Sequence, residues 1–218
     1  MRPEPGAGAT ADAARAMGLE PLVMPLFKVE PVDWQAPQAD GFDGLLLTSA
    51  NAARHGGAQL PALRGLRVHA VGAATAEAAR EAGFAIAGIG EAGLERLLGS
   101  LASDLRLLHL CGEHRVAVAA RQAITAVPVY RSAALPPPAE LRAIAGQTVA
   151  VHSPRAGRRL AELVDQAGVD RGTVRIAAIG AAAAAAAGPG WEACEAADTP
   201  DDGAVLALAA RLCDWGGR

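Results

Sequence analysis

The chain has 218 residues, of which 51% are hydrophobic and 3% aromatic, enough for one large domain or two small ones with cores of Ala, Leu and Val. A formal net charge of −3 gives no support for nucleic-acid binding, which needs a clustered basic surface. No apolar run approaches the roughly 20 residues that a membrane helix needs, so neither nucleic acid nor membrane is expected as a partner.

The first predicted helix covers Ala7–Met17, and almost nothing precedes it. Met1-Arg2-Pro3 is too short for a strand, whereas a doubly wound lobe usually begins with a central strand. Either the start codon is misplaced downstream of the true one, or this lobe lacks that strand. We favour the misplaced start.

Five short apolar runs further along the chain predict β-strands, and a helical stretch follows each of them. This alternation favours parallel sheets with helices on both faces, and the continuous apolar runs suit strands that are buried on both sides. The predicted strands are Gly44–Thr48, Arg67–Val71, Leu105–Leu110, Thr148–His152 and Val174–Ile179. The predicted helices begin near Ala50, Ala73, His114, Pro154 and Ala181.

Two motifs occur twice, in the same order. Gly44–Arg54 resembles Thr148–Arg158, and Arg67–Ala79 resembles the stretch from Val174 through the alanines after Gly180. Two matched pairs in register indicate duplication of one α/β unit. The predicted fold is therefore α/β with two similar lobes that face a shared cleft, each a parallel sheet flanked by helices.

Two proline-marked stretches, Pro25–Asp33 and Val127–Pro138, are predicted to be extended rather than helical. If the chain crosses between the lobes in both of them, they form a two-stranded connector. The predicted division is then a discontinuous lobe (1–24 plus 139–218), a continuous lobe (34–126) and connector strands (25–33 and 127–138).

Candidate binding residues follow the carboxyl ends of the predicted strands, where ligands bind in open parallel sheets. Each precedes a helix N-terminus, where free N–H groups and the helix dipole favour anions. Several such ends can hold a polyanion without a dense arginine patch. The alternative is that Ser49, Thr75 and Ser153 only cap their helices. The strand-end residues are Thr48, Ser49, Gly72, His152, Ser153 and Gly180.

Tyr130, the only tyrosine, lies in the second extended stretch. A phenol stays protonated at neutral pH and can donate a hydrogen bond or a proton. A connector position would place it at the back or floor of the cleft. Packing of a linker tyrosine against one lobe is the alternative.

Motifs for other chemistries are weak. Gly88–Gly93 matches the G-x-G-x-x-G pattern of dinucleotide sites, but the preceding strand, Phe84–Ala87, is weak and no acidic residue closes the next strand. His109 and Cys111 lack the further ligands that a metal needs. The three cysteines have no paired spacing, which favours reduced thiols in a cytoplasmic protein.

The order and spacing of eight short motifs resemble the uroporphyrinogen-III synthase family over most of the chain. Each motif is weak alone, but together they are specific. They are Arg2–Pro5, Pro25–Glu30, Thr48–Arg54, Val71–Ala76, Leu110–Glu113, Val129–Arg131, His152–Arg155 and Ala178–Gly180.

The resemblance implies two α/β lobes with a two-stranded connector and a cyclising lyase of haem and porphyrin biosynthesis. Its substrate would be hydroxymethylbilane, a linear tetrapyrrole with eight carboxylates, and its product uroporphyrinogen III, in which the last ring is inverted. It implies no cofactor and no metal. The substrate would lose its hydroxyl, and the far pyrrole would attack through a spiro intermediate.

The resemblance also implies roles for single residues. Tyr130 would help the hydroxyl to leave, and Ser49, Asn51, Thr75 and Ser153 would hold the acetate and propionate arms. The other predicted substrate-binding residues are Arg2, Thr48, Gly72, His152, Arg155 and Gly180. A cytoplasmic monomer is expected, and the pathway allows a transient contact with the preceding enzyme.

Three departures from the family pattern weaken the residue assignments. The opening strand is absent. Ala181 and Ala182 stand where a hydroxyl residue is more common, and Cys111 stands where an arginine is more common. Two rival interpretations remain: a two-lobed module that binds a tetrapyrrole or another polyanion without turnover, and an unrelated nicotinamide-dependent oxidoreductase that uses Gly88–Gly93.

Overall fold

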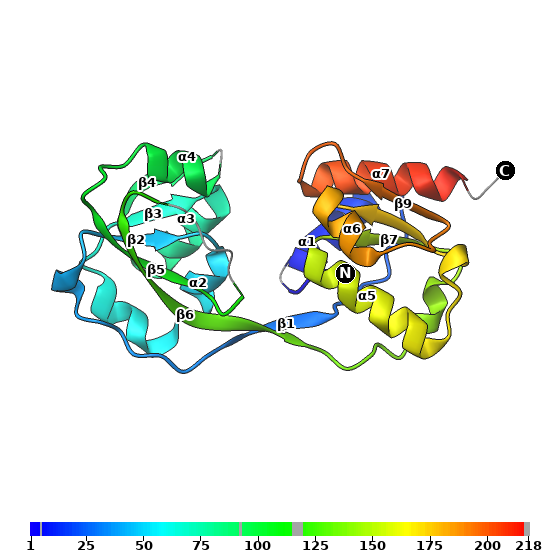
Figure 1. The fold of residues 1–218 in the computed structure, drawn as a ribbon, viewed down its shortest axis with the longest axis horizontal. Helices are drawn as coiled ribbons and strands as arrows, with labels where there is room; N and C mark the ends of the chain where they lie inside the picture. The colour runs from blue at the N-terminus through cyan, green and yellow to red at the C-terminus, as the bar shows by residue number, and fades with distance from the viewer. Residues whose placement is uncertain (5, 92, 115–119, 216–218) are drawn as a thin grey trace. The chain divides into compact units, whose positions relative to one another are not determined.

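The computed structural model describes residues 1–4, 6–91, 93–114 and 120–215. The chain divides into two compact units (Figure 1). Unit 1 contains Met1–Lys28 and Ala134–Arg218, and unit 2 contains Val29–Ala133. The helix predicted to begin near His114 falls on residues 115–119, outside the described residues.

Unit 2 is built on a sheet with the strand order β1-β6-β5-β2-β3-β4 in the described part of the chain, where β1 covers Phe27–Pro31 and β6 covers Ala123–Ala134. The pairs β2–β3, β3–β4, β2–β5 and β5–β6 are parallel, so these strands have their carboxyl ends at the same edge. The strands are β2 (Gly44–Leu47), β3 (Val68–Val71), β4 (Ile86–Gly90) and β5 (Arg106–Gly112). The helices are α2 (Ala50–His55), α3 (Ala73–Glu81), α4 (Leu94–Gly99) and the 3-10 helices η1 (Ala39–Gly41) and η2 (Gly57–Leu63).

Both faces of this sheet are covered. Leu45 and Leu47 pack on one face against the alanines of α2 and α3, and these small side chains let the helices approach closely. Leu46 points to the other face and packs with Leu97 and Leu98 of α4. Burial on both sides explains why the strand sequences are apolar without alternation.

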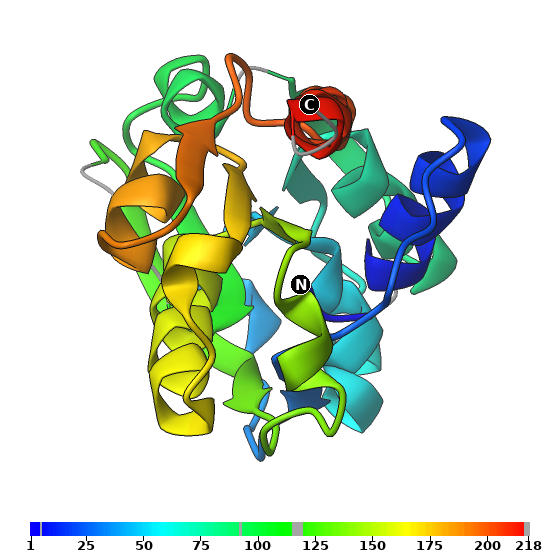
Figure 2. The same cartoon turned by 90° about the vertical axis from the view of Figure 1, so that its right-hand side faces the viewer.

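Unit 1 holds, among its described residues, a parallel sheet in the order β7-β8-β9. Figure 2 views the molecule from the side of this unit. The strands are β7 (Thr148–Val151), β8 (Arg175–Ala178) and β9 (Ala193–Ala196). The helices are α1 (Gly6–Ala16), α5 (Pro154–Ala167), α6 (Ala181–Ala187), α7 (Asp202–Trp215) and the 3-10 helices η3 (Leu141–Ile144) and η4 (Arg171–Thr173).

The helices of unit 1 also lie on two sheet faces. Val151 and Ile176 pack with Leu160 of α5 in one cluster, whereas Ala177 packs with Leu208 of α7 in another. The ribbon accordingly shows α5 (yellow) and α7 (red) on opposite sides of the strands (Figures 1 and 2).

The chain passes between the units within two paired strands, β1 (Phe27–Pro31) and β6 (Ala123–Ala134), which run side by side (Figure 1). Val32 N donates to Val129 O at 3.2 Å, and Leu135 N donates to Leu26 O at 2.9 Å. These bonds occur in opposite order along the two segments, so the pair is antiparallel.

The predicted fold class is confirmed: two α/β lobes with parallel sheets, joined by a two-stranded connector. Helices begin at Ala50, Ala73, Pro154 and Ala181, as predicted. The prediction missed α4, β9 and α7. Strand β4 begins two residues later than the weak run at Phe84 and includes Gly88 and Gly90.

Candidate functional site

The carboxyl end of β2 carries two of the predicted binding residues of unit 2. Thr48 is half-buried, and a hydrogen bond of 3.1 Å joins its Oγ1 to Nε2 of the buried His109 on β5. Ser49 is the N-cap of α2, and its Oγ accepts a hydrogen bond from the Asn51 amide at 3.2 Å. A capping hydroxyl keeps its own O–H as a donor, so the cap and an anion contact are compatible.

The end of β3 carries Gly72 and, one turn into α3, Thr75. Gly72 is the N-cap of α3 with φ +83° and ψ 154°, a conformation that side chains other than glycine rarely adopt. Thr75 is only 5% exposed, so the folded unit presents little of its hydroxyl to a ligand. Of the predicted hydroxyl contacts in unit 2, those of Thr48 and Ser49 are therefore the more accessible.

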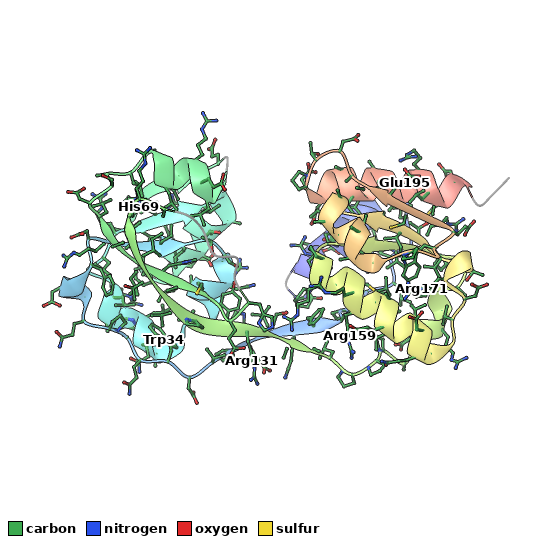
Figure 3. The ribbon with its side chains drawn as sticks, in the orientation of Figure 1. Trp34, His69, Arg131, Arg159, Arg171 and Glu195 are labelled. Atoms are coloured by element: carbon green, nitrogen blue, oxygen red, sulfur yellow. The ribbon has the colours of Figure 1, made fainter. Side chains whose placement is uncertain are left out.

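Tyr130 is half-buried on β6, where it stands opposite Gly112 of β5. The Glu113 amide donates to the Tyr130 carbonyl oxygen at 3.0 Å and holds its backbone in place. The next residue, Arg131, is labelled in Figure 3 and pairs with Glu30 of β1 at 2.6 Å. The phenol thus projects from a strand that is bonded on both sides.

Two predicted residues of unit 1 lie at the start of α5. Ser153 is its N-cap, and its Oγ accepts from the Ala156 amide at 3.1 Å. The Arg155 guanidinium lies 4.4 Å from the centre of the Phe27 ring, a cation–π contact that leaves its N–H groups able to donate. Gly180 is the N-cap of α6 in an extended conformation with φ 176°.

Arg2 and His152 meet at Asp202, the first residue of α7. Arg2 Nη1 donates to both carboxylate oxygens of Asp202, at 2.6 and 2.7 Å, so this guanidinium already has an anionic partner. His152 Nε2 lies 3.3 Å from Asp202 Oδ1, without hydrogen-bond geometry. Burial is the main cause that lowers the pKa of His152 to about 4, so the imidazole is neutral at pH 7.

His152 also lines a cavity of about 520 Å³ inside unit 1, between α1, β7 and α7. Its walls are mostly apolar, with Ala11, Ala150 and Leu206 among them. The Met1 nitrogen donates to the carbonyl oxygen of Ala150 at 2.8 Å, at this edge of β7. The cavity adjoins the edge of β7 that pairs with no strand among the described residues.

The sequence interpretation missed three contacts of the predicted residues. His109 bonds Thr48, Gly112 faces Tyr130, and Asp202 binds Arg2. His109 had a signal, because it stands at the carboxyl end of a predicted strand. The other two contacts join segments far apart in the chain and have no local signal.

The glycines of the G-x-G-x-x-G pattern have a structural explanation. Gly88 and Gly90 lie within β4, at the edge of the sheet, and a Cβ on Gly90 would lie 2.7 Å from Cβ of Leu97. The close packing of α4 on this strand therefore requires a glycine. Gly93 precedes only the short helix α4, with φ +90°.

Within the described ranges, no group of three or more His, Cys, Asp or Glu side chains is arranged to hold a metal ion. A membrane-spanning helix is also absent from this part of the chain, where every helix is too short or too polar.

Comparisons with known proteins agree with the fold and the motifs. The family model described as "Uroporphyrinogen-III synthase HemD" matches residues 8–207. The solved structure of uroporphyrinogen-III synthetase from Helicobacter pylori aligns with a TM-score of 0.65 at 17% identity, covering 89% of this chain and 93% of that one. A mutant uroporphyrinogen III synthase from Thermus thermophilus aligns with a TM-score of 0.56 at 21% identity, covering 96% and 95%. No curated protein matches.

Proposed function

The chain belongs to the uroporphyrinogen-III synthase family, and we propose that it cyclises hydroxymethylbilane to uroporphyrinogen III with inversion of the terminal pyrrole ring. The observation that carries this proposal is the family match over residues 8–207, which spans both units. The family is one of cyclising lyases in tetrapyrrole biosynthesis. The alternative of a binding module without turnover is not favoured.

The reaction needs a proton donor at the leaving hydroxyl and a fixed geometry for closure. Loss of water gives an electrophilic methylene carbon, which the far pyrrole attacks at its substituted carbon. The spiro intermediate then opens and closes again with the last ring reversed. In our proposal the Tyr130 phenol donates a hydrogen bond or a proton to the departing oxygen.

The eight carboxylates of the substrate suit helix N-termini and hydroxyls. In unit 2 we assign them Thr48, Ser49 and Asn51, at the junction of β2 and α2, together with the N-terminus of α3 at Gly72 and Thr75. One helix end contributes only about 0.3–1 kcal/mol for a nearby carboxylate, so several ends are needed.

Unit 1 offers a matching set. Ser153 and Arg155 lie at the N-terminus of α5, and Gly180 is the N-cap of α6. Arg2 and His152 belong to the same proposed set, although Asp202 already pairs with Arg2 and the ring of His152 is buried. Their share in binding is therefore expected to be smaller than that of Ser153 and Arg155.

We further propose that the protein acts as a monomer in the cytoplasm. The family supplies hydroxymethylbilane as the substrate. This compound closes spontaneously to the uninverted isomer, so rapid delivery is an advantage. A transient contact with the enzyme that produces it would serve this purpose.

The product isomer tests the proposed function. The purified chain is given freshly generated hydroxymethylbilane, and the products are oxidised and separated as type I and type III porphyrins. Predominantly type III product, above an enzyme-free control, is the expected result. Type I alone, together with measurable affinity for the tetrapyrrole, would favour the binding module instead.

A further inference from the structure

The pairing of β5 with β6 contains an irregularity next to Tyr130. Cys111 is paired with Pro128, but the next residue, Gly112, is paired with Tyr130, so Val129 is an extra residue on β6. Pro128 has no N–H for the ladder, and Val129 is fully buried in the core of unit 2. Such a bulge changes the direction of the following side chain, here the phenol.

The Tyr130 ring lies against the backbone of Gly112. A Cβ at residue 112 would be 2.9 Å from both Cε2 and Cζ of Tyr130 and 3.2 Å from its hydroxyl oxygen. The two 2.9 Å distances are shorter than a Cβ atom tolerates without a shift. Gly112 is not among the described glycines with positive φ, so its backbone conformation does not require glycine. The neighbouring ring does.

We propose that Gly112 is a positioning residue for the reaction: its missing side chain makes the space that fixes the Tyr130 hydroxyl. This inference rests on the proposed role of Tyr130. The contacting atoms are at the far end of the tyrosine side chain, so an added methyl group would displace the ring rather than the strand. Because a displacement of about 1 Å can cost roughly 100-fold in rate, Gly112→Ala should reduce kcat by about 10- to 100-fold.

Gly88→Ala provides a matched control. Gly88 is also a strand glycine of unit 2 without positive φ, and the nearest atom to its Cβ would be Nδ1 of His69 at 3.8 Å, an ordinary contact. We expect this variant to keep kcat and KM. Equal unfolding midpoints for the two variants would show that any loss in Gly112→Ala is not a loss of folded protein.

The ring position can be read without substrate, because Tyr130 is the only tyrosine. Tyrosine labelled with ¹³C at Cζ gives one NMR resonance, and its chemical shift reports the surroundings of the phenol. We expect Gly112→Ala to shift this resonance and Gly88→Ala to leave it in place. An unshifted resonance in Gly112→Ala would overturn the positioning role.

A double-mutant cycle tests whether the position of the Tyr130 hydroxyl affects the reaction. With Tyr130→Phe in the same chain, the hydroxyl is absent, so Gly112→Ala should reduce kcat by less than about 3-fold, against about 10- to 100-fold with Tyr130 present. An equal loss in both backgrounds would contradict the proposal. Full turnover by Tyr130→Phe alone would instead overturn the proposed role of Tyr130, and this failure appears without any change at Gly112.

Discussion

Units 1 and 2 contain the same succession of elements with one difference beside the first strand. In unit 2 the order β2-α2-β3-α3-β4 forms parallel neighbours β2-β3-β4, and β7-α5-β8-α6-β9 does the same in unit 1. In unit 2 the other edge of β2 is covered by β5. In unit 1 no strand among the described residues covers that edge of β7, and the cavity lies there.

This difference changes the surroundings of the residue that follows β2 in unit 2 and β7 in unit 1. Thr48 follows β2 and His152 follows β7, at matching positions of the repeat. The neighbouring strand β5 supplies His109 as the partner of Thr48. Without such a strand, His152 lies beside Asp202 of helix α7. The flanking strand thus supplies Thr48 with a hydrogen-bond partner, whereas both ring nitrogens of His152 lack one among the described residues, and unit 1 should be the less rigid at this point.

The largest expected difference is in amide hydrogen exchange. Leu45 N donates to the carbonyl oxygen of Arg67, the residue before β3, so the next amide, that of Leu46, faces β5. In unit 1, Ile179 N donates to Val151 O, so the amide of Ala150 faces the uncovered edge. We expect Leu46 to exchange at least roughly 100-fold more slowly than Ala150, after correction for intrinsic rates. Similar protection measured by NMR would contradict the predicted difference in rigidity.

The next largest effect concerns the stability cost of replacing the N-cap glycines of α3 and α6 by alanine. Gly72 has φ +83°, whereas Gly180 is extended at φ 176°, and a Cβ at either position would meet no atom within 4 Å. Gly72→Ala should therefore cost about 1–3 kcal/mol of unfolding free energy through strain, and Gly180→Ala less than about 0.5 kcal/mol. Urea unfolding of the two variants measures this, and equal costs would rule out backbone strain as the cause.

At the position that follows the first strand, only unit 1 has a titratable side chain, so we expect His152 to make stability depend on pH. His152 has a pKa near 4 in the folded protein, below its ordinary 6.5, so the unfolded chain binds a proton first as the pH falls. Its contribution to stability is complete above pH 6.5 and is lost between 6.5 and 4. With allowance for solvent screening we expect about 1–2 kcal/mol.

Unfolding in urea at about pH 7 and about pH 4.5 measures this loss, with His152→Asn as the comparison. The variant lacks the imidazole, so its unfolding free energy should depend less on pH, and the Met1 amine, whose pKa burial lowers to about 5, remains as a second source of pH dependence. Identical pH dependence in both proteins would exclude His152 as the source.

The smallest expected effect concerns the two capping serines. Ser49→Asp and Ser153→Asp keep an N-cap acceptor, so each should stay within about 0.5 kcal/mol of the original stability. The added carboxylate repels an anionic substrate, and we expect KM to rise about 5-fold in each. Steady-state kinetics of both variants decide whether the two units contribute alike. A rise in only one would show that the repeat is structural in the other.

The sequence was sufficient to predict the fold because its strongest signals are local. Ser153 followed by Pro154 marks the start of a helix, and continuous apolar runs mark buried strands. Strand β9 was missed because Ala193–Ala196 has only four residues, none of them fully buried. Helix α7 had a detectable signal, since Val205, Leu208 and Leu212 recur with a helical period.

The details of the candidate site were less predictable. The register of β5 against β6 depends on the bulge at Val129, and only this register brings Gly112 to Tyr130. The pairing of Arg2 with Asp202 joins opposite ends of the chain. Contacts of this kind depend on how elements pack, and no local pattern encodes them.

The rate and the product isomer of Tyr130→Phe test the central claim most directly. Enzyme in excess over hydroxymethylbilane is followed for a single turnover, and the products are corrected for an enzyme-free control. If the phenol assists departure of the hydroxyl while the rest of the site fixes the geometry of closure, the rate falls about 100-fold and the enzymatic product is still type III. An unchanged rate, or a change to type I product, would contradict this division of roles.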